Sequence, residues 1–278
     1  MRSIKQKLLV SFLVLIGVSV LLCGGVGIAA NYMSANSMLE QTLQATASLA
    51  AERVSYELTS YKDMVQDLGM MPQLSDETVS NAEKEEIVNE WAEKYGMERG
   101  NLLTISGDSL FDGNNYSDRE YFQQAIQGNA WISTPTISKI TGELSIMVAA
   151  PVWQDGVDGG TVVGVVYFVP KETFLNDIMC SIKVSKNSGA YMIDSEGITI
   201  ADTTLETVSV QNIEEEAKTN ASLNQLAALH AEMRAGNTGY GSYSMNGQDR
   251  YLAYAPIKES NNWSIAITAP ASDFMSTT

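Results

Sequence analysis

The hydrophobic pattern changes character along the chain. Residues 8–30 carry no charged side chain, and a helix of these 23 residues would cross a hydrocarbon layer of about 30 Å. From Leu39 to Leu68, apolar residues recur every three or four positions, which predicts one long amphipathic helix over residues 31–72. Gly69 and Pro72 are typical of its end. Short strand-like runs then alternate with short helical stretches, which predicts an α+β fold.

The apolar run over residues 8–30 fits a membrane helix or a signal peptide. It exceeds the roughly 7–15 apolar residues of a signal peptide, which favours an uncleaved anchor, although GIAA at 27–30 resembles a weak cleavage site. Arg2, Lys5 and Lys7 precede the run, and no cation follows it before Arg53. We therefore expect residues 1–7 in the cytoplasm, a transmembrane helix in the inner (plasma) membrane, and the chain after residue 30 outside it.

Two similar units follow the long helix. The first, over residues 73–180, has a helix that Ser80 or Asn81 caps, a hairpin of NLLTI (101–105) and SLF (109–111), and a helix that Asp118 caps. Its last strands are LSIMVAAPV (144–152) and TVVGVVYFV (161–169). The second unit, over residues 181–278, has a hairpin within 188–201, a helical stretch over 213–234 and three more strands.

The two units align with each other near their ends. AYAPI (253–257) aligns with AAPVW (149–153), and WSIAITAPASDF (263–274) aligns with VVGVVYFVPKETF (162–174). This internal repeat predicts two tandem modules of one topology, each with an antiparallel sheet.

The composition excludes several classes of protein. The net charge is −16, and after residue 7 the remaining 14 cations face 33 acids, so binding of nucleic acid is not expected. Cys23 and Cys180 should lie in different environments and not form a disulfide, with Cys180 half-buried. Cys and His spacings for zinc are absent, so neither a metal nor another cofactor is expected. His230 has no nucleophile motif beside it; we interpret it as a packed helix residue and expect no enzyme activity.

The candidate ligand site lies between residues 116 and 169. Arg119 follows a loop and begins a helix, and aromatic and hydroxyl side chains surround it in the sequence. One cation among such groups at a sheet edge predicts a pocket for a small anionic guest. The predicted ligand-binding residues are Tyr116, Arg119, Tyr121, Phe122, Trp131, Ser133, Thr136 and Tyr167. The alternatives are a surface ion pair of Arg119 with Asp118 or Glu120, and core packing for Trp131.

The span, the long helix and the two modules resemble the double Cache (dCache) ectodomains of bacterial transmembrane receptors. The motifs are DREYF (118–122), TG (141–142), APV (150–152) and VVGVVYF (162–168), and the resemblance covers residues 31–275. It implies two PAS-like antiparallel sheets stacked on the long helix, with the ligand in the membrane-distal module, which is the first one here. Receptors of this kind include chemoreceptors, sensor kinases and cyclic-dinucleotide enzymes.

One branch of that family binds amino acids, and this chain matches its motif in part. Arg119 matches the arginine that binds the carboxylate, while Tyr121 and Phe122 stand in place of a tryptophan and a tyrosine. Thr136 and Val166 stand where a further tyrosine and the aspartate for the amine would be. Without an acid on that strand, an ammonium group would lack an anionic partner. The departures predict a small ligand with a carboxylate rather than an α-amino acid.

The resemblance implies a methyl-accepting chemotaxis protein or, as alternatives, the input region of a sensor histidine kinase or a cyclic-di-GMP enzyme. A membrane-tethered enzyme, a solute-binding protein and a dimerisation stalk are further alternatives. The long helix is expected to form a homodimer and to carry ligand-induced displacement to the membrane. No second apolar run precedes Thr278, so cytoplasmic signalling partners would require a further C-terminal part. Whether the second module binds a ligand of its own is left open.

Overall fold

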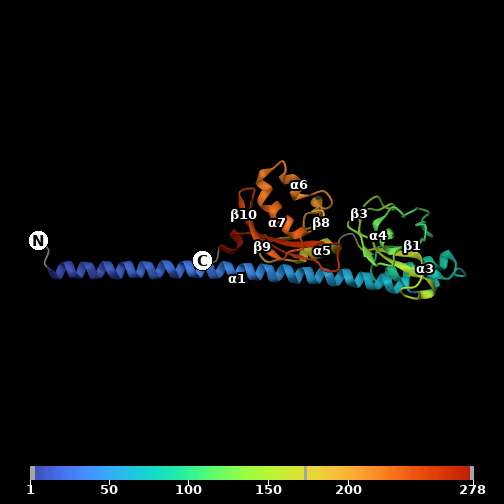
Figure 1. Ribbon diagram of the computed structural model, residues 1–278, viewed down its shortest axis with the longest axis horizontal. Helices are drawn as coiled ribbons and strands as arrows, with labels where there is room; N and C mark the ends of the chain where they lie inside the picture. Colours follow the sequence, from blue (N-terminus) through green and yellow to red (C-terminus); the bar gives the residue numbers. More distant parts are fainter. Residues whose placement is uncertain (1–3, 172–173, 276–278) are drawn as a thin grey trace.

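The computed structural model describes residues 4–171 and 174–275, and its longest element is one helix. Helix α1 (Ile4–Gly69) has 66 residues, so it is roughly 100 Å long at about 1.5 Å per residue. Two modules lie on the same side of its C-terminal half, and its N-terminal part extends away from them (Figure 1). The predicted amphipathic helix is confirmed, with Val54, Leu58 and Val65 buried on the side that faces the modules.

The residues of the predicted span, 8–30, belong to α1. A search of the residues that the structure describes finds no helix sufficiently long and apolar to cross a bilayer. The transmembrane helix therefore stays a prediction.

The distal module, at the C-terminal end of α1, has a four-stranded antiparallel sheet. Its strands are β1 (Arg99–Thr104), β2 (Trp131–Ile132), β5 (Val148–Trp153) and β6 (Val162–Val169), in the order β1-β6-β5-β2. Strands β3 (Thr136–Ile137) and β4 (Leu144–Ser145) form a separate two-stranded hairpin. The helical elements are α2 (Pro72–Ser75), α3 (Asn81–Lys94), α4 (Glu120–Ala125) and η1 (Gln154–Gly156). Helix α5 (Phe174–Ser181) follows β6 and packs against β7 (Gly189–Ile193) and β8 (Thr199–Asp202) of the proximal module.

The proximal module repeats this arrangement with one additional edge strand. Its strands are β7 (Gly189–Ile193), β8 (Thr199–Asp202), β9 (Gly239–Met245), β10 (Gln248–Pro256) and β11 (Ser264–Pro270), in the order β8-β7-β11-β10-β9. Its helical elements are η2 (Leu205–Thr207), α6 (Ile213–Ala217), η3 (Ala221–Leu223), α7 (Asn224–Arg234) and α8 (Ser272–Met275). If β1, β6, β5 and β2 are equated with β7, β11, β10 and β9, the strand orders agree, as the sequence repeat predicts.

Each sheet has an inner face against α1 and an outer face with its own apolar cluster. Alternation along the strands produces this division, since neighbouring side chains point to opposite faces. On β6, Val166 and Phe168 belong to the core shared with α1, whereas Val165 and Tyr167 belong to an outer cluster. A third cluster covers the outer face of the proximal sheet, beneath α6 and α7. The two outer faces are therefore the places where the fold has room for ligand sites.

Several local expectations are confirmed and others are wrong. Ser80 and Glu83 form the capping box of α3, as the sequence predicts. The predicted cap at Asp118 is wrong, because α4 begins after Arg119 and the Asp118 carboxylate instead binds Lys139 at 2.5 Å. Cys180 is exposed rather than half-buried.

Two of the expected elements differ in extent. The strand expected at 109–111 is reduced to one bridge between Leu103 and Ser109. The Ser109 hydroxyl accepts hydrogen bonds from the backbone N–H groups of Phe111 and Asp112, which bends the chain out of an extended course. The helix expected over residues 213–234 is divided into α6, η3 and α7, with the Asn220 side chain capping η3.

Candidate functional site

The outer face of the distal sheet brings polar and aromatic side chains together. Asn101 on β1 is the register partner of Tyr167 on β6, and its amide donates a hydrogen bond to the Tyr167 hydroxyl at 3.2 Å. Trp131 on β2 is the register partner of Ala149, which belongs to the same outer cluster. Because β-strand side chains alternate, Arg99 lies on the same face as Asn101.

Three tyrosines form the centre of this face. The ring centroids of Tyr116 and Tyr167 are 5.7 Å apart, and those of Tyr121 and Tyr167 are 5.2 Å apart. All three side chains are buried, and α4 carries Tyr121 and Phe122 onto the sheet. Burial is the main reason why the pKa of each tyrosine lies above its ordinary value. The three hydroxyls therefore remain protonated and can donate hydrogen bonds.

Two buried donors in this cluster lack partners. Among the described residues, neither the Tyr121 hydroxyl nor the Trp131 indole nitrogen makes a hydrogen bond. A buried polar group without a partner costs about 1–3 kcal/mol, so such groups are rare and need an explanation. Both donors lie on the outer face of the sheet that also carries the arginines, and a bound guest with acceptor atoms would satisfy them.

Two arginines connect the cluster to the β3–β4 hairpin. Arg119 donates through Nη1 to Thr136 Oγ1 at 3.2 Å, and Arg99 donates through Nη2 to Ser138 Oγ at 3.0 Å. Nη1 of Arg99 also pairs with the carboxylate of Glu98, while its Nε is buried without a partner among the described residues. The hairpin is further held by Lys139, which binds Asp118. Two guanidinium groups therefore hold one short hairpin next to the tyrosines.

An acid also reaches this cluster, from the loop after β1. Asp112 Oδ2 accepts hydrogen bonds from the Tyr116 hydroxyl and the Asn101 amide, both at 2.7 Å. Desolvation alone would raise the pKa of Asp112, but hydrogen bonds, led by that from Tyr116, outweigh it and leave the pKa below its ordinary value. The carboxylate is therefore charged at neutral pH. The inference that an ammonium group would lack an anionic partner considered only the β6 strand and overlooked this loop.

The structure brings the eight predicted residues to one region. Five belong to the outer cluster, namely Tyr116, Tyr121, Phe122, Trp131 and Tyr167. Ser133 is buried beside them and accepts a hydrogen bond from Met147 N at 2.9 Å, while Thr136 and Arg119 bind each other. That these residues bind a ligand stays a prediction.

Sequence reasoning missed three polar residues of this region, Arg99, Asn101 and Asp112. A signal existed for two of them. Arg99, Asn101 and Leu103 alternate with Gly100 and Leu102, so a strand beginning at residue 99 places a cation and an amide on one face. Asp112 gave no such signal because it lies in an irregular loop.

Comparison with known families decides what kind of domain this is. A family model described as Cache domain, dCache_1, matches residues 33–278. The chain belongs to the Cache domain family. A comparison with curated proteins finds no match.

Solved Cache-like structures agree with the fold. The ligand-binding domain of the Pseudomonas fluorescens chemoreceptor CtaA, in complex with L-serine, has a TM-score of 0.67 at 16% identity, covering 85% of this chain and 99% of that one. The sensory domain of the Campylobacter jejuni chemoreceptor Tlp3, with isoleucine bound, has a TM-score of 0.63 at 12% identity, covering 87% and 96%. The extracellular domain of mmHK1S-Z2, described as a histidine kinase, has a TM-score of 0.63 at 11% identity, covering 84% and 98%. At these identities the likeness concerns the fold alone.

Proposed function

We propose that this chain is the ligand-sensing region of a membrane-anchored, extracytoplasmic receptor, and that its distal Cache module binds a small molecule with a carboxylate. The observation that carries the proposal is the pair of buried donors without partners, Tyr121 Oη from α4 and Trp131 Nε1 from β2, at the sheet face that carries Arg99 and beneath the helix that Arg119 begins. Guanidinium groups bind carboxylates in a bidentate manner, and neutral tyrosine hydroxyls and an indole N–H donate to the same kind of acceptor.

Ligand binding would act through the hairpin and the sheet. A carboxylate at Arg119 competes with Thr136 for the guanidinium, so the β3–β4 hairpin would lose its hydrogen bond to Arg119. Strand β5 packs against α1, and Asn261 of the proximal module donates to the Ile132 carbonyl oxygen of β2 at 2.6 Å. A shift of the distal sheet would reach both α1 and the proximal module by these contacts. Its extent is limited by the difference in ligand affinity between the two states.

A specific observation favours α-amino acids as a second class of ligand. Asp112 supplies a charged carboxylate beside Tyr116, which is the partner that an ammonium group requires. The ligand-binding domain of CtaA and the sensory domain of Tlp3 hold L-serine and isoleucine. Since Asp112 already accepts hydrogen bonds from Tyr116 and Asn101, an ammonium group would have to share this acceptor.

The output of the receptor is proposed as chemotaxis signalling, with a histidine kinase or a cyclic-di-GMP enzyme as alternatives. Structures of both chemoreceptors and histidine kinases share the fold, so the sequence that follows residue 278 in the gene would distinguish them. A homodimer through α1 is supported by exposed apolar side chains on the helix, including Met38, Leu49 and Tyr56. The charge-free run over residues 8–30 supports the membrane anchor.

Calorimetric titration of the full chain in detergent tests the ligand class. The probes are acetate, pyruvate, lactate, L-serine and L-isoleucine, each titrated separately. A carboxylate probe should bind, and Arg119→Gln should weaken it by about 10- to 100-fold because a charge-assisted hydrogen bond is lost. The control Lys218→Gln removes a cation of the proximal module that pairs with Glu215. Binding that is unchanged in both Arg119→Gln and Arg99→Gln would contradict a distal carboxylate site.

The variant Asp112→Asn separates the two ligand classes. It removes the negative charge but keeps an acceptor for the Tyr116 hydroxyl. A specific loss of L-serine and L-isoleucine, with pyruvate and lactate unaffected, would assign the ligand to the amino acids. Equal binding of all probes by the variant would exclude a role of Asp112 in recognising an amine.

A further inference from the structure

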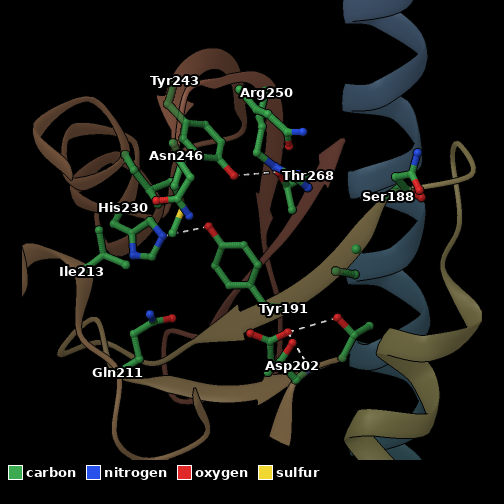
Figure 2. Close-up of a pocket in the computed structure, with 18 residues that line it drawn as sticks. Ser188, Tyr191, Asp202, Gln211, Ile213, His230, Tyr243, Asn246, Arg250 and Thr268 are labelled. Carbon is green, nitrogen blue, oxygen red and sulfur yellow. Dashed lines mark hydrogen bonds between the residues drawn. The ribbon is translucent and has the colours of Figure 1, made fainter. Parts of the chain in front are cut away.

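The proximal module contains a cavity of about 370 Å³ on the outer face of its sheet. Strands β7, β8, β9, β10 and β11 supply one side, and α6 and α7 supply the other. Figure 2 shows the hydroxyl groups of Tyr191 and Tyr243 turned toward the same space, from β7 and β9. The size lies at the lower end of the range for small-molecule sites. Ile213, Leu226 and Met245 give the cavity an apolar part.

One arginine, Arg250, lines this cavity and has donor groups that no other described residue uses. Arg250 is the register partner of Tyr243, and its Nε donates to Thr268 Oγ1 at 3.1 Å. The Tyr243 hydroxyl lies 2.8 Å from the same Thr268 oxygen. Within the described part of the chain, the two terminal nitrogens of Arg250 make neither a hydrogen bond nor an ion pair with another residue. Thr268 therefore fixes the orientation of the guanidinium while leaving its paired donors available.

The acids near Arg250 are bound by other groups. Asp202 lines the cavity, but its carboxylate accepts hydrogen bonds from the Thr203 hydroxyl, the Thr204 N–H and the Thr207 hydroxyl. The Asp273 oxygens accept hydrogen bonds from Ser185 and Asn187, and these bonds, with a smaller effect of the Arg250 charge, lower the pKa of Asp273. Of the described residues that line the cavity, Arg250 is the only one that is cationic at neutral pH.

His230 and Tyr191 form the wall opposite the arginine. The Tyr191 hydroxyl lies 2.7 Å from His230 Nε2, and the His230 side chain is 1% exposed. Burial lowers the pKa of His230 to about 4, so the imidazole is neutral at pH 7 and does not add a charge. Its Nδ1 is buried with no partner among the described residues. The wall is therefore polar and uncharged, which suits the neutral part of a guest whose charged end meets Arg250.

We propose that this cavity is a second ligand site, separate from that of the distal module, and that it binds a small carboxylate through the terminal nitrogens of Arg250. The apolar part contributed by Ile213, Leu226 and Met245 would accommodate a short carbon chain. The hydroxyl groups of Tyr191 and Tyr243 would offer polar contacts to further atoms of the guest. A chain with two sites could respond to two ligands, or to one ligand over two concentration ranges.

The test separates this site from the distal one by removing Arg119, one of the two arginines of the distal module. The full chain carrying Arg119→Gln is titrated in detergent with acetate, propionate, pyruvate, lactate and succinate, one probe at a time. At least one probe should still bind with a stoichiometry of one per chain. Adding Arg250→Gln should weaken that binding by about 10- to 100-fold, since the charge-assisted hydrogen bonds are lost.

Two further variants make the result specific. Lys218→Gln removes a cation of the same module that pairs with Glu215 outside the cavity, so it should leave binding unchanged. Thr268→Val is close in shape but removes the oxygen that orients Arg250, so it should weaken binding in the Arg119→Gln chain even if Arg250→Gln fails to fold. The proposal is overturned if none of the five probes binds the Arg119→Gln chain, or if the Arg250→Gln and Thr268→Val chains bind as tightly as their parent. Loss of all probe binding in the Arg119→Gln chain would support the proposed distal ligand site and contradict the proposed proximal one.

Discussion

Tyr121 and Tyr167 lie with their ring centroids 5.2 Å apart on the outer face of the distal sheet, but only Tyr167 has a hydrogen-bond partner within the described residues. The Tyr167 hydroxyl accepts from Asn101, whereas the Tyr121 hydroxyl is buried without one. Desolvation raises the pKa of both tyrosines, so both hydroxyls keep their protons. The outer face of the distal sheet therefore has a buried donor without a partner where a ligand is expected.

We predict opposite effects on stability for two tyrosine-to-phenylalanine changes. Tyr121→Phe removes a buried group without a partner, so the free energy of unfolding should stay constant or rise by up to about 1 kcal/mol, while ligand affinity falls. Tyr116→Phe removes a hydrogen bond to the Asp112 carboxylate and should cost about 1–3 kcal/mol. Urea unfolding of the full chain measures both. A Tyr121→Phe chain that is destabilised as much as Tyr116→Phe would show that the Tyr121 hydroxyl is already satisfied.

Regular periodicity made much of the fold predictable. The continuous apolar run over 162–169 and the alignment of 263–274 with 162–174 predict β6, β11 and a shared topology, and the two strand orders agree. The failures occur where short polar side chains bind the backbone. Ser109 replaces an expected strand with a turn, and Asp118 pairs with Lys139 instead of capping a helix. Such local choices depend on tertiary partners, which periodicity does not contain.

The candidate site was predictable where the residues are consecutive or share a motif. The pattern of one segment, DREYF at 118–122, was sufficient to predict Arg119, Tyr121 and Phe122 as site residues. Arg99 lies 20 positions earlier, and only the pairing of β1 with β6 brings it to the same face. Arg250 of the proximal cavity was not singled out, because its role depends on Thr268 from the neighbouring strand. Sites assembled across strands require the register, which one sequence does not supply.

The contact between the end of α1 and β5 should not tolerate a methyl group. A Cβ on Gly69 would lie 2.1 Å from the Pro151 carbonyl oxygen, which is closer than any real contact. Gly69→Ala should therefore force α1 and β5 apart and lower the free energy of unfolding by about 1–3 kcal/mol in urea titrations. The control Ser60→Ala, on the exposed side of the same helix, should change it by less than about 0.5 kcal/mol. An unchanged unfolding midpoint for Gly69→Ala would show that β5 does not rest on α1 in this way.

Ser138 should govern the local stability of the β3–β4 hairpin. Its hydroxyl oxygen accepts from Arg99 Nη2 and from the backbone N–H groups of Ile140 and Thr141. Ser138→Ala should therefore accelerate hydrogen exchange of those two amides. Thr141→Val, which removes only the hydrogen bond accepted from Glu143 N, should leave the amide of Ile140 protected. A saturating carboxylate ligand competes with Thr136 for Arg119, so it should speed hydrogen exchange in the wild-type hairpin. Unaltered exchange at saturation would exclude the hairpin from the response.

His230 should make the stability of the protein depend on pH between about 4 and 6.5. Burial lowers its pKa to about 4 in the folded state, against about 6.5 when unfolded. In that window the unfolded chain binds more protons than the folded chain does. The stabilising contribution of the neutral imidazole to the free energy of unfolding is therefore present above pH 6.5 and is lost as the pH falls toward 4. From pH 7 to pH 5 the wild type should lose about 2 kcal/mol more than His230→Gln does, measured by urea unfolding. Carboxylates such as Asp112, whose pKa is lowered, change the free energy of unfolding with pH equally in both proteins. The difference between the wild type and His230→Gln therefore reports the histidine. Equal losses in the two proteins would mean that His230 is hydrated and titrates normally in the folded state.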